Sequence, residues 1–345
     1  EGLSFYDKLI DSILDKDILP FATLYHWDLP KVFDDNGGWQ HRDTCEWFAD
    51  YTDLLMKKFG DRLHSVSTIN EPWCVAWLGY YWGEHAPGIK NLKATAKSMH
   101  HILLAHAKSL AVMREYNQKN LGIVLNKCYV QPIDSEKENI ISAKIYDEIH
   151  NLWFDEAIFK GSYPYSLLSI FGDYMPKDYQ DDLKLISKKI DWLGINYYTR
   201  SLVSHEPKEK HFKFKIVKGD LPKTDMGWEV FPEGLSLILQ NTIKNYSGNL
   251  PLHITENGMA NDDELENGDV NDYKRIEYFS LHLNEIYKLL CNGYPIKSYF
   301  AWSLLDNFEW SFGYDKRFGL VYVDYKNQQR IPKASWYEFK KQLKK

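Results

Sequence analysis

The chain has 345 residues, of which 44% are hydrophobic and 26% are charged, a balance typical of a folded globular protein. Its formal net charge of −6 argues against a nucleic-acid partner, because no basic surplus is available to replace phosphate counterions. No apolar run approaches ~18 residues, so we expect no membrane span and no membrane partner. A chain of this length is too long for one small core and fits either two domains or one large α/β barrel.

Apolar runs that predict buried strands alternate with segments of helical periodicity along the chain. The predicted strands are residues 19–27, 64–70, 121–129, 190–198, 251–256 and 298–305. The predicted helices are residues 2–17, 43–59, 91–117, 136–158, 232–246, 272–291 and 335–343. We expect residues 79–88, rich in Gly, Trp and Tyr, to form a loop, and the polar, Lys-rich residues 203–224 to form a surface loop or hairpin.

The strand–helix repeat predicts an α/β fold. Near-continuous apolar strands of this kind are buried on both faces, as in a parallel sheet or barrel. We predict a (β/α)8 TIM-barrel type of domain over residues 1–345, with residues 203–224 as a surface insertion. A doubly wound open sheet is the alternative, and it is disfavoured because no GxGxxG follows any predicted strand.

Two of the predicted strands end in a carboxylate next to an asparagine. Residues 68–72 read Thr-Ile-Asn-Glu-Pro and residues 252–258 read Leu-His-Ile-Thr-Glu-Asn-Gly. A proline or a glycine breaks each strand at once, which predicts Glu71 and Glu256 at the mouth of the sheet or barrel. Two such carboxyls are the minimum for cleaving a glycosidic bond, since one protonates the leaving oxygen and the other attacks the sugar. The high aromatic content, 15%, also fits a carbohydrate site, where sugar faces stack on rings.

The cysteines indicate free thiols. Cys45, Cys74, Cys128 and Cys291 are widely spaced and form no CxxC pair, which favours a reducing compartment, such as the cytoplasm, over a disulfide framework or a zinc site. Because the chain begins at Glu1 rather than Met, the sequence leaves the native start and any signal peptide open.

Two other kinds of chemistry are disfavoured. His100, His101 and His106 lie on one predicted helix, but HEXXH is absent and no carboxylate or Cys falls at ligand spacing, so packing and surface roles are expected. A serine hydrolase of the open-sheet α/β type is disfavoured because no GxSxG appears.

Six motifs in chain order resemble those of the family 1 glycoside hydrolases, the β-glucosidase and β-galactosidase group of (β/α)8 barrels. They are Tyr-His-Trp-Asp-Leu-Pro at 25–30, Thr-Ile-Asn-Glu-Pro at 68–72, the Gly-rich segment at 79–88, Gly-Ile-Asn-Tyr-Tyr at 194–198, Ile-Thr-Glu-Asn-Gly at 254–258, and Ala-Trp-Ser-Leu-Leu-Asp-Asn-Phe-Glu-Trp at 301–310. Each motif alone is a weak signal, whereas six in order over the whole chain are highly specific.

The resemblance also implies that roughly the first hundred residues of the family, with the first two βα units of the barrel, are absent and that about six units are present. Such a remnant would expose two strand edges, which invites pairing with other protein. We therefore expect that a homo-oligomeric partner or a complementing fragment could fill the gap. The alternative to an active enzyme is an inactive fragment or a non-catalytic sugar-binding relative.

The resemblance assigns roles to individual residues. It implies that Glu71 is the general acid/base and Glu256 the nucleophile of a retaining double displacement, with carboxyls ~5–5.5 Å apart. The implied substrate-binding residues are His26, Trp27, Asn70, Asn196, Tyr198, Trp302, Glu309, Trp310 and Phe318, although Phe318 could equally pack in the core. No metal or cofactor is implied, because two carboxyls perform the chemistry.

Glu309 bears on the choice of substrate. A carboxylate at this position would repel a 6-phosphosugar, so we predict a neutral β-D-glucoside or short β-linked oligosaccharide, with β-galactosides and β-fucosides as further substrates.

Overall fold

The computed structural model describes residues 1–343, and the chain divides into two compact units. Unit 1 comprises Glu1–Asn126 and His150–Gly194. Unit 2 comprises Lys127–Ile149 and Ile195–Lys345. The boundary passes through two strands, because β3 (Leu121–Pro132) and β4 (Trp192–His205) each begin in unit 1 and end in unit 2.

Unit 1 holds parallel strands interleaved with helices. Its complete elements are α1 (Gly2–Leu14), β1 (Phe21–Tyr25), α2 (Lys31–Asp35), η1 (Gly38–Gln40), α3 (Asp43–Phe59), β2 (Ser65–Asn70), η2 (Cys74–Trp82), α4 (Leu92–Glu115), α6 (Trp153–Lys160), α7 (Tyr165–Phe171), η4 (Gly172–Tyr174) and α8 (Tyr179–Ile186). β2 pairs in parallel with β1 on one side and with β3 on the other. Every residue of β2 is buried, as expected of a parallel strand covered on both faces.

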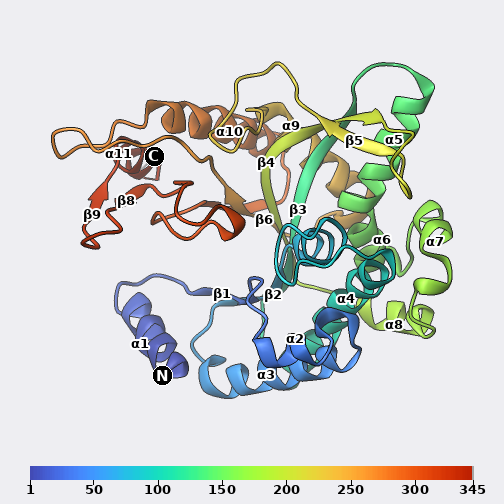
Figure 1. Cartoon of the computed structure of the whole chain (residues 1–345). Coiled ribbons are helices and arrows are strands. Elements are labelled where there is room, and N and C mark those ends of the chain that lie inside the picture. The colour runs from blue at the N-terminus through green and yellow to red at the C-terminus, as the bar shows by residue number, and fades with distance from the viewer. Residues whose placement is uncertain (344–345) are drawn as a thin grey trace. The chain divides into compact units, whose positions relative to one another are not determined.

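Helix α4 is the central helix of unit 1. It packs against α3 and α8, and the three lie together in Figure 1. The helix begins where Asn91 acts as its N-cap, with the side-chain oxygen accepting a hydrogen bond of 3.0 Å from the backbone N–H of Ala94. The predicted helix 91–117 is therefore confirmed, and the cap explains its start.

The expected loop at residues 79–88 is partly wrong. The π-helix η2 covers Cys74–Trp82, so the loop begins only at Gly83. This segment is almost entirely apolar and mostly buried, and a buried backbone must find partners for its N–H and C=O groups. A helical turn supplies them within the segment, which the glycine and aromatic composition did not suggest.

Unit 2 combines strands, helices and an antiparallel hairpin. Its complete elements are α5 (Lys137–Asp147), β5 (Phe214–Val217), α9 (Pro232–Thr242), η5 (Ile243–Ser247), β6 (Leu252–Asn257), α10 (Tyr273–Cys291), β7 (Ile296–Ala301), η6 (Trp310–Phe312), β8 (Val321–Val323), β9 (Arg330–Pro332) and α11 (Ala334–Gln342), while η3 (Glu148–Leu152) crosses the boundary. β6 neighbours β4 and pairs in parallel with β7, and β5 pairs antiparallel with β4. Helix α10 packs against α9 and α11, as Figure 1 shows. A small core of buried Met259, Tyr278, Phe279 and Leu320 includes two residues of α10, and Trp336 and Phe339 of α11 pack against it.

Two predicted strand ends move in the structure. β4 continues past Tyr198 to His205, because its far end pairs with β5. β7 ends at Ala301 rather than at residue 305. The backbone of Ser303 instead exchanges hydrogen bonds with a later segment, accepting from Leu320 at 2.8 Å and donating to Phe318 at 3.2 Å.

The fold class predicted from the sequence is confirmed. Strands β1, β2 and β3 pair in parallel in unit 1, strands β6 and β7 pair in parallel in unit 2, and helices separate these strands along the chain, which is the α/β pattern. Within residues 1–343, none of the helices combines the length and the apolar character that a membrane span requires.

Candidate active site

In unit 1 the predicted acid/base Glu71 follows directly after β2. Its backbone has a φ of 49°, a conformation that non-glycine residues rarely adopt and that is concentrated at functional sites. The backbone N–H of Glu71 donates to the carbonyl of Val124 on β3 at 2.9 Å, and the residue is only 5% exposed. The backbone of Glu71 is thus held between the end of β2 and the neighbouring strand β3.

The Cys74 thiol donates a hydrogen bond of 2.9 Å to Oε2 of Glu71. This partner was missed in the sequence, where Cys74 was considered only as a free thiol. The signal in the sequence was the spacing of Glu71 and Cys74. They are three residues apart at the start of a helical segment, where side chains at this spacing face each other.

The other predicted residues of unit 1 form a linked group at the ends of β1 and β2. The amide Nδ2 of Asn70 lies 3.3 Å from Nε2 of His26, and the indole N–H of Trp27 donates to the carbonyl of Asn70 at 2.9 Å. Burial lowers the pKa of His26 to about 4, so the ring is neutral at neutral pH. An amide N–H donates, so the neutral ring fits this contact with Nε2 as the acceptor.

Trp27 shares the unusual backbone of Glu71. Its φ is 83°, and its ring lies 5.4 Å from that of His85, between ring centroids. His26, Trp27, Asn70 and Glu71 thus lie together at the ends of the adjacent strands β1 and β2.

In unit 2 the predicted nucleophile Glu256 lies near the end of β6. The phenol of Tyr198 donates a hydrogen bond of 2.5 Å to Oε2 of Glu256. Glu256 is 8% exposed. Beside it, Thr255 donates to Oδ1 of Asn196 at 2.6 Å, which connects β6 to β4. The structure therefore brings Asn196, Tyr198 and Glu256 together, although the two β4 residues lie within a long strand and not at its end.

Asn257 fixes the end of β6. It is fully buried; its Nδ2 donates to the carbonyl of Tyr197 at 2.6 Å, and its Oδ1 accepts from the phenol of Tyr299 at 2.6 Å. Both neighbouring strands thus hold this residue, and with it the adjacent Glu256.

Trp302 lies directly against Gly258, the residue that follows Asn257. Its backbone N–H donates to the carbonyl of Asn257 at 2.9 Å. A Cβ atom at Gly258 would lie 2.0 Å from the Trp302 carbonyl oxygen, so only glycine permits this approach. The glycine that reads as a strand terminator in the sequence is therefore required by the packing of Trp302.

The remaining predicted residues lie after β7, on residues 302–320, which we call the β7 loop. Glu309 and Trp310 are half-buried, and Trp310 has a φ of 45°. The backbone N–H of Glu309 donates to the carbonyl of Gly313 at 2.6 Å, which closes a tight turn around the two residues. Phe318 is 2% exposed, and its ring centroid lies 6.1 Å from that of Tyr198.

Trp228 is a second residue that the sequence reasoning missed. Its ring centroid lies 5.4 Å from that of Tyr198 and 6.2 Å from that of Phe318. It supports the tyrosine that contacts Glu256. Its position between the Lys-rich segment 203–224 and the predicted helix 232–246 gave no signal, because the contact depends on tertiary packing.

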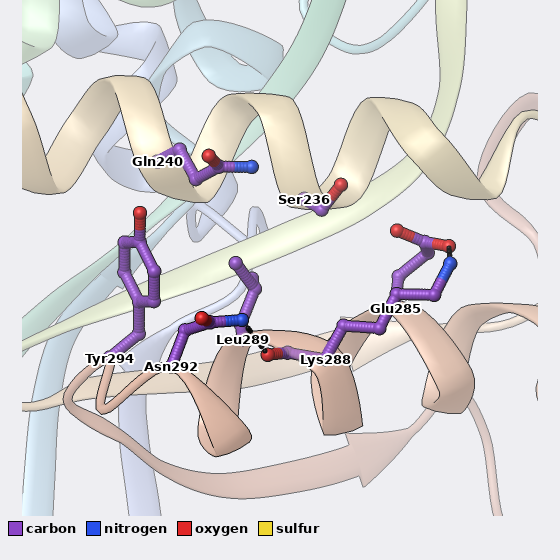
Figure 2. A pocket seen from close by; sticks show the side chains of 7 residues that line it. All are labelled: Ser236, Gln240, Glu285, Lys288, Leu289, Asn292 and Tyr294. Carbon is purple, nitrogen blue, oxygen red and sulfur yellow. Dashed lines mark hydrogen bonds and ion pairs between the residues drawn. The ribbon is translucent and has the colours of Figure 1, made fainter.

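A cavity of about 490 Å³ lies elsewhere in unit 2, between α9 and α10 (Figure 2). Its lining residues are Ser236, Gln240, Glu285, Lys288, Leu289, Asn292 and Tyr294. None of the predicted site residues lines it. Within residues 1–343, no group of three or more His, Cys, Asp or Glu side chains is arranged to hold a metal ion.

Parallel strands separated by helices, with glutamates at the carboxyl ends of β2 and β6, define an α/β protein of the barrel-forming type that presents carboxyl chemistry at its strand ends. Comparison with known proteins then specifies the family. The profile of Glycosyl hydrolase family 1 matches residues 1–345, and the chain belongs to this family.

Individual relatives agree with this assignment. The chain is 43% identical to Beta-glucosidase A of Thermotoga maritima over 348 residues, which cover 100% of this chain and 77% of the relative. The solved structure of a Thermotoga maritima β-glucosidase in complex with deoxynojirimycin superposes with a TM-score of 0.95 at 43% identity, covering 99% of this chain and 78% of that one. A more distant relative, the 6-phospho-beta-galactosidase of Clostridium acetobutylicum, is 35% identical and covers 99% of this chain and 78% of the relative.

Proposed function

We propose that the chain is a retaining β-glycosidase that hydrolyses terminal, non-phosphorylated β-D-glucosides. The observation that carries the proposal is the hydrogen bond of 2.5 Å from Tyr198 to Glu256, because it orients a strand-end carboxylate that also lies in the family's nucleophile motif. The membership of Glycosyl hydrolase family 1 supports the same reaction class.

The proposed reaction has two steps. In the first, Glu256 attacks the anomeric carbon while Glu71 donates its proton to the glycosidic oxygen, so the C–O bond to the leaving group breaks and a glycosyl ester forms. In the second, Glu71, now ionised, takes a proton from water, and the water oxygen displaces Glu256. Two inversions at the anomeric carbon retain the β configuration.

The neighbours of each carboxyl fit its proposed role. The phenol of Tyr198 supports the ionised form of Glu256, because a hydrogen bond to a carboxylate favours its charge. Glu71 is held at a fixed backbone position and receives the Cys74 thiol, so its side chain is oriented before the substrate arrives.

Sugar recognition is proposed for the residues around these carboxyls. His26, which contacts Asn70, would bind a hydroxyl of the sugar, and Asn70 would contact the hydroxyl next to the anomeric carbon. Trp302 would provide an apolar platform under the sugar ring. The other residues proposed to line the site are Trp27, Asn196, Trp310 and Phe318.

Glu309 supports a neutral glucoside over a phosphorylated one. Family membership alone does not decide the question, since relatives include both a β-glucosidase and a 6-phospho-β-galactosidase. A half-buried carboxylate next to the outer hydroxyls would accept hydrogen bonds from them and repel a phosphate.

The proposal is tested by hydrolysis of 4-nitrophenyl β-D-glucoside by the 345-residue chain and its variants. Glu256→Ala should lose several orders of magnitude in kcat, whereas Glu71→Ala should retain part of the activity on this activated substrate, whose leaving group needs little protonation. The first product observed by NMR should be β-glucose. Glu285→Ala, which removes a buried glutamate from the cavity between α9 and α10, should behave like the parent chain.

A parental rate for Glu256→Ala, or an α product, would contradict the assignment. Absence of turnover by a folded parent chain would favour the alternative, a non-catalytic sugar-binding relative.

A further inference from the structure

Six charged side chains of unit 2 form a continuous chain of ion pairs in which anions and cations alternate. The order is Asp272, Arg275, Asp263, Lys333, Asp306 and Arg317. After the first pair, the successive N–O distances are 2.7, 2.6, 2.7 and 2.7 Å. All of these side chains except that of Arg317 are fully buried. Three carboxylates and three cations balance, so the chain of charges is formally neutral.

The Asp306 end of this chain closes the β7 loop. Oδ1 of Asp306 accepts from the backbone N–H of Gly319 at 2.9 Å, and Oδ2 accepts from Arg317 at 2.7 Å. Glu309 and Trp310 lie in the chain between Asp306 and these two partners. The Asp306 carboxylate therefore joins the start of the segment that carries two of the proposed sugar-binding residues to its end.

Asp263 and Arg275 hold residues 258–263, which follow β6 and which we call the β6 loop. Asp263 accepts from the side chain of Asn261 at 2.8 Å. Arg275, its partner in the ion-pair chain, donates to the carbonyl of Met259 at 3.3 Å. The β6 loop is thus fixed by the same buried charges.

Lys333 connects the two loops. Its Nζ lies 2.6 Å from Asp263 and 2.7 Å from Asp306, and its side chain is fully buried at the start of α11. A buried ion pair contributes little net stability, because desolvation offsets the attraction, but it demands one geometry.

We propose that Lys333, bridging Asp263 and Asp306, is a positioning residue that sets the β7 loop against the β6 loop and thereby sharpens selection of the sugar. The proposal rests on the proposed function, since it assigns Glu309 and Trp310 to the outer hydroxyls. If the bridge is removed, we expect the loss in kcat/KM to differ between substrates according to the hydroxyls that they carry.

The sharpest variant is the double substitution Lys333→Met with Asp263→Asn. Lys333→Met alone leaves an unbalanced buried carboxylate and could prevent folding. The double variant instead leaves two closed ion pairs, Asp272 with Arg275 and Asp306 with Arg317, and removes the bridge together with the ion pair between Asp263 and Arg275. The matched control is Lys341→Met with Glu338→Gln, which removes an exposed ion pair of 2.9 Å on α11.

Two measurements test the proposal. The first is kcat and KM for 4-nitrophenyl β-D-glucoside and for the β-D-fucoside, which lacks the 6-hydroxyl and carries its 4-hydroxyl in the axial orientation. In the double variant kcat/KM for the glucoside should fall on the order of 10²-fold, the usual cost of a displacement near 1 Å, and the fucoside should lose much less. The second is hydrogen exchange, which should become faster in the β6 loop (258–263) and in the β7 loop (302–320). The control should match the parent chain in both.

An unchanged glucoside-to-fucoside ratio overturns the proposal, whatever the exchange shows. If the folded parent hydrolyses neither substrate, the proposed function fails instead. Hydrogen exchange then decides the positioning role by itself, and parental exchange in both loops overturns it.

Discussion

The phenolic oxygen of Tyr198 lies 2.5 Å from Oε2 of Glu256, although the two residues are 58 positions apart in the chain. The contact joins β4 to β6 within unit 2. The aromatic rings of Trp228 and Phe318 contact the ring of Tyr198, so its phenol has little freedom to move away from Glu256.

The first prediction concerns this contact. Tyr198→Phe removes one hydrogen bond to a charged carboxylate, worth ~1.5–3 kcal/mol, so kcat on an aryl β-glucoside should fall roughly 10- to 100-fold. The ring remains, and the stability to urea should therefore change little. Tyr299→Phe, which removes a phenol that donates to Asn257 and not to the carboxylate, is the comparison. A larger kcat loss in that variant would show that the packing of β6 matters more than the Tyr198 phenol.

The second prediction concerns the thiol on Glu71. Cys74→Ala removes a weak donor, so the loss in kcat/KM should be about 2- to 10-fold for a substrate with a poor leaving group, such as cellobiose. For 4-nitrophenyl β-D-glucoside the loss should be smaller, because its departure needs little proton donation. Cys74→Ser keeps a donor and should restore much of the activity. Cys291→Ala, at an exposed cysteine, serves as the control, and equal losses on both substrates would contradict the role.

The third prediction concerns selection against phosphate. Glu309→Gln keeps the size of the side chain and removes its charge, so the repulsion of a 6-phosphoglucoside should decrease. The ratio of kcat/KM for the neutral glucoside to that for the 6-phosphoglucoside should fall at least tenfold. Glu338→Gln removes a surface charge and should leave the ratio unchanged. A constant ratio in Glu309→Gln would remove the argument for a neutral substrate.

The fourth prediction concerns pH and stability. Burial lowers the pKa of His106 and of His282 to about 4, below the ordinary value of 6.5. The unfolded chain therefore binds more protons than the folded chain between pH 6.5 and pH 4, and the free energy of unfolding should decrease as the pH falls through this window. The free energy of unfolding should have its full value above pH 6.5. At pH 4 it should be lower by about 3 kcal/mol for each ring.

Urea unfolding at a series of pH values measures this slope. His106→Gln should flatten it, since glutamine does not titrate, whereas His41→Gln at an exposed ring should not. An identical slope in His106→Gln would show that this ring is not responsible.

Much of the fold was predictable because its signals are local. Apolar runs such as residues 64–70 and 251–256 mark buried strands, and the glutamate, asparagine and breaker residue that follow them are adjacent in sequence. The predicted strand boundaries were wrong where a segment distant in the sequence forms the backbone hydrogen bonds instead. Residues 303–305 pair with residues 318–321 instead of continuing β7, and β4 is extended by its pairing with β5.

The amino-acid sequence by itself determined the α/β class, the family and the residues after the strands that are candidates for chemistry. These depend on the order and periodicity of neighbouring residues, which folding does not alter. Only the tertiary structure decided the partners of those residues: Tyr198 on Glu256, Cys74 on Glu71, and Lys333 between Asp263 and Asp306. Hydrogen bonds and buried ion pairs require atoms within about 3 Å in a defined direction, and for segments distant in the chain that geometry exists only after the strands and loops have packed.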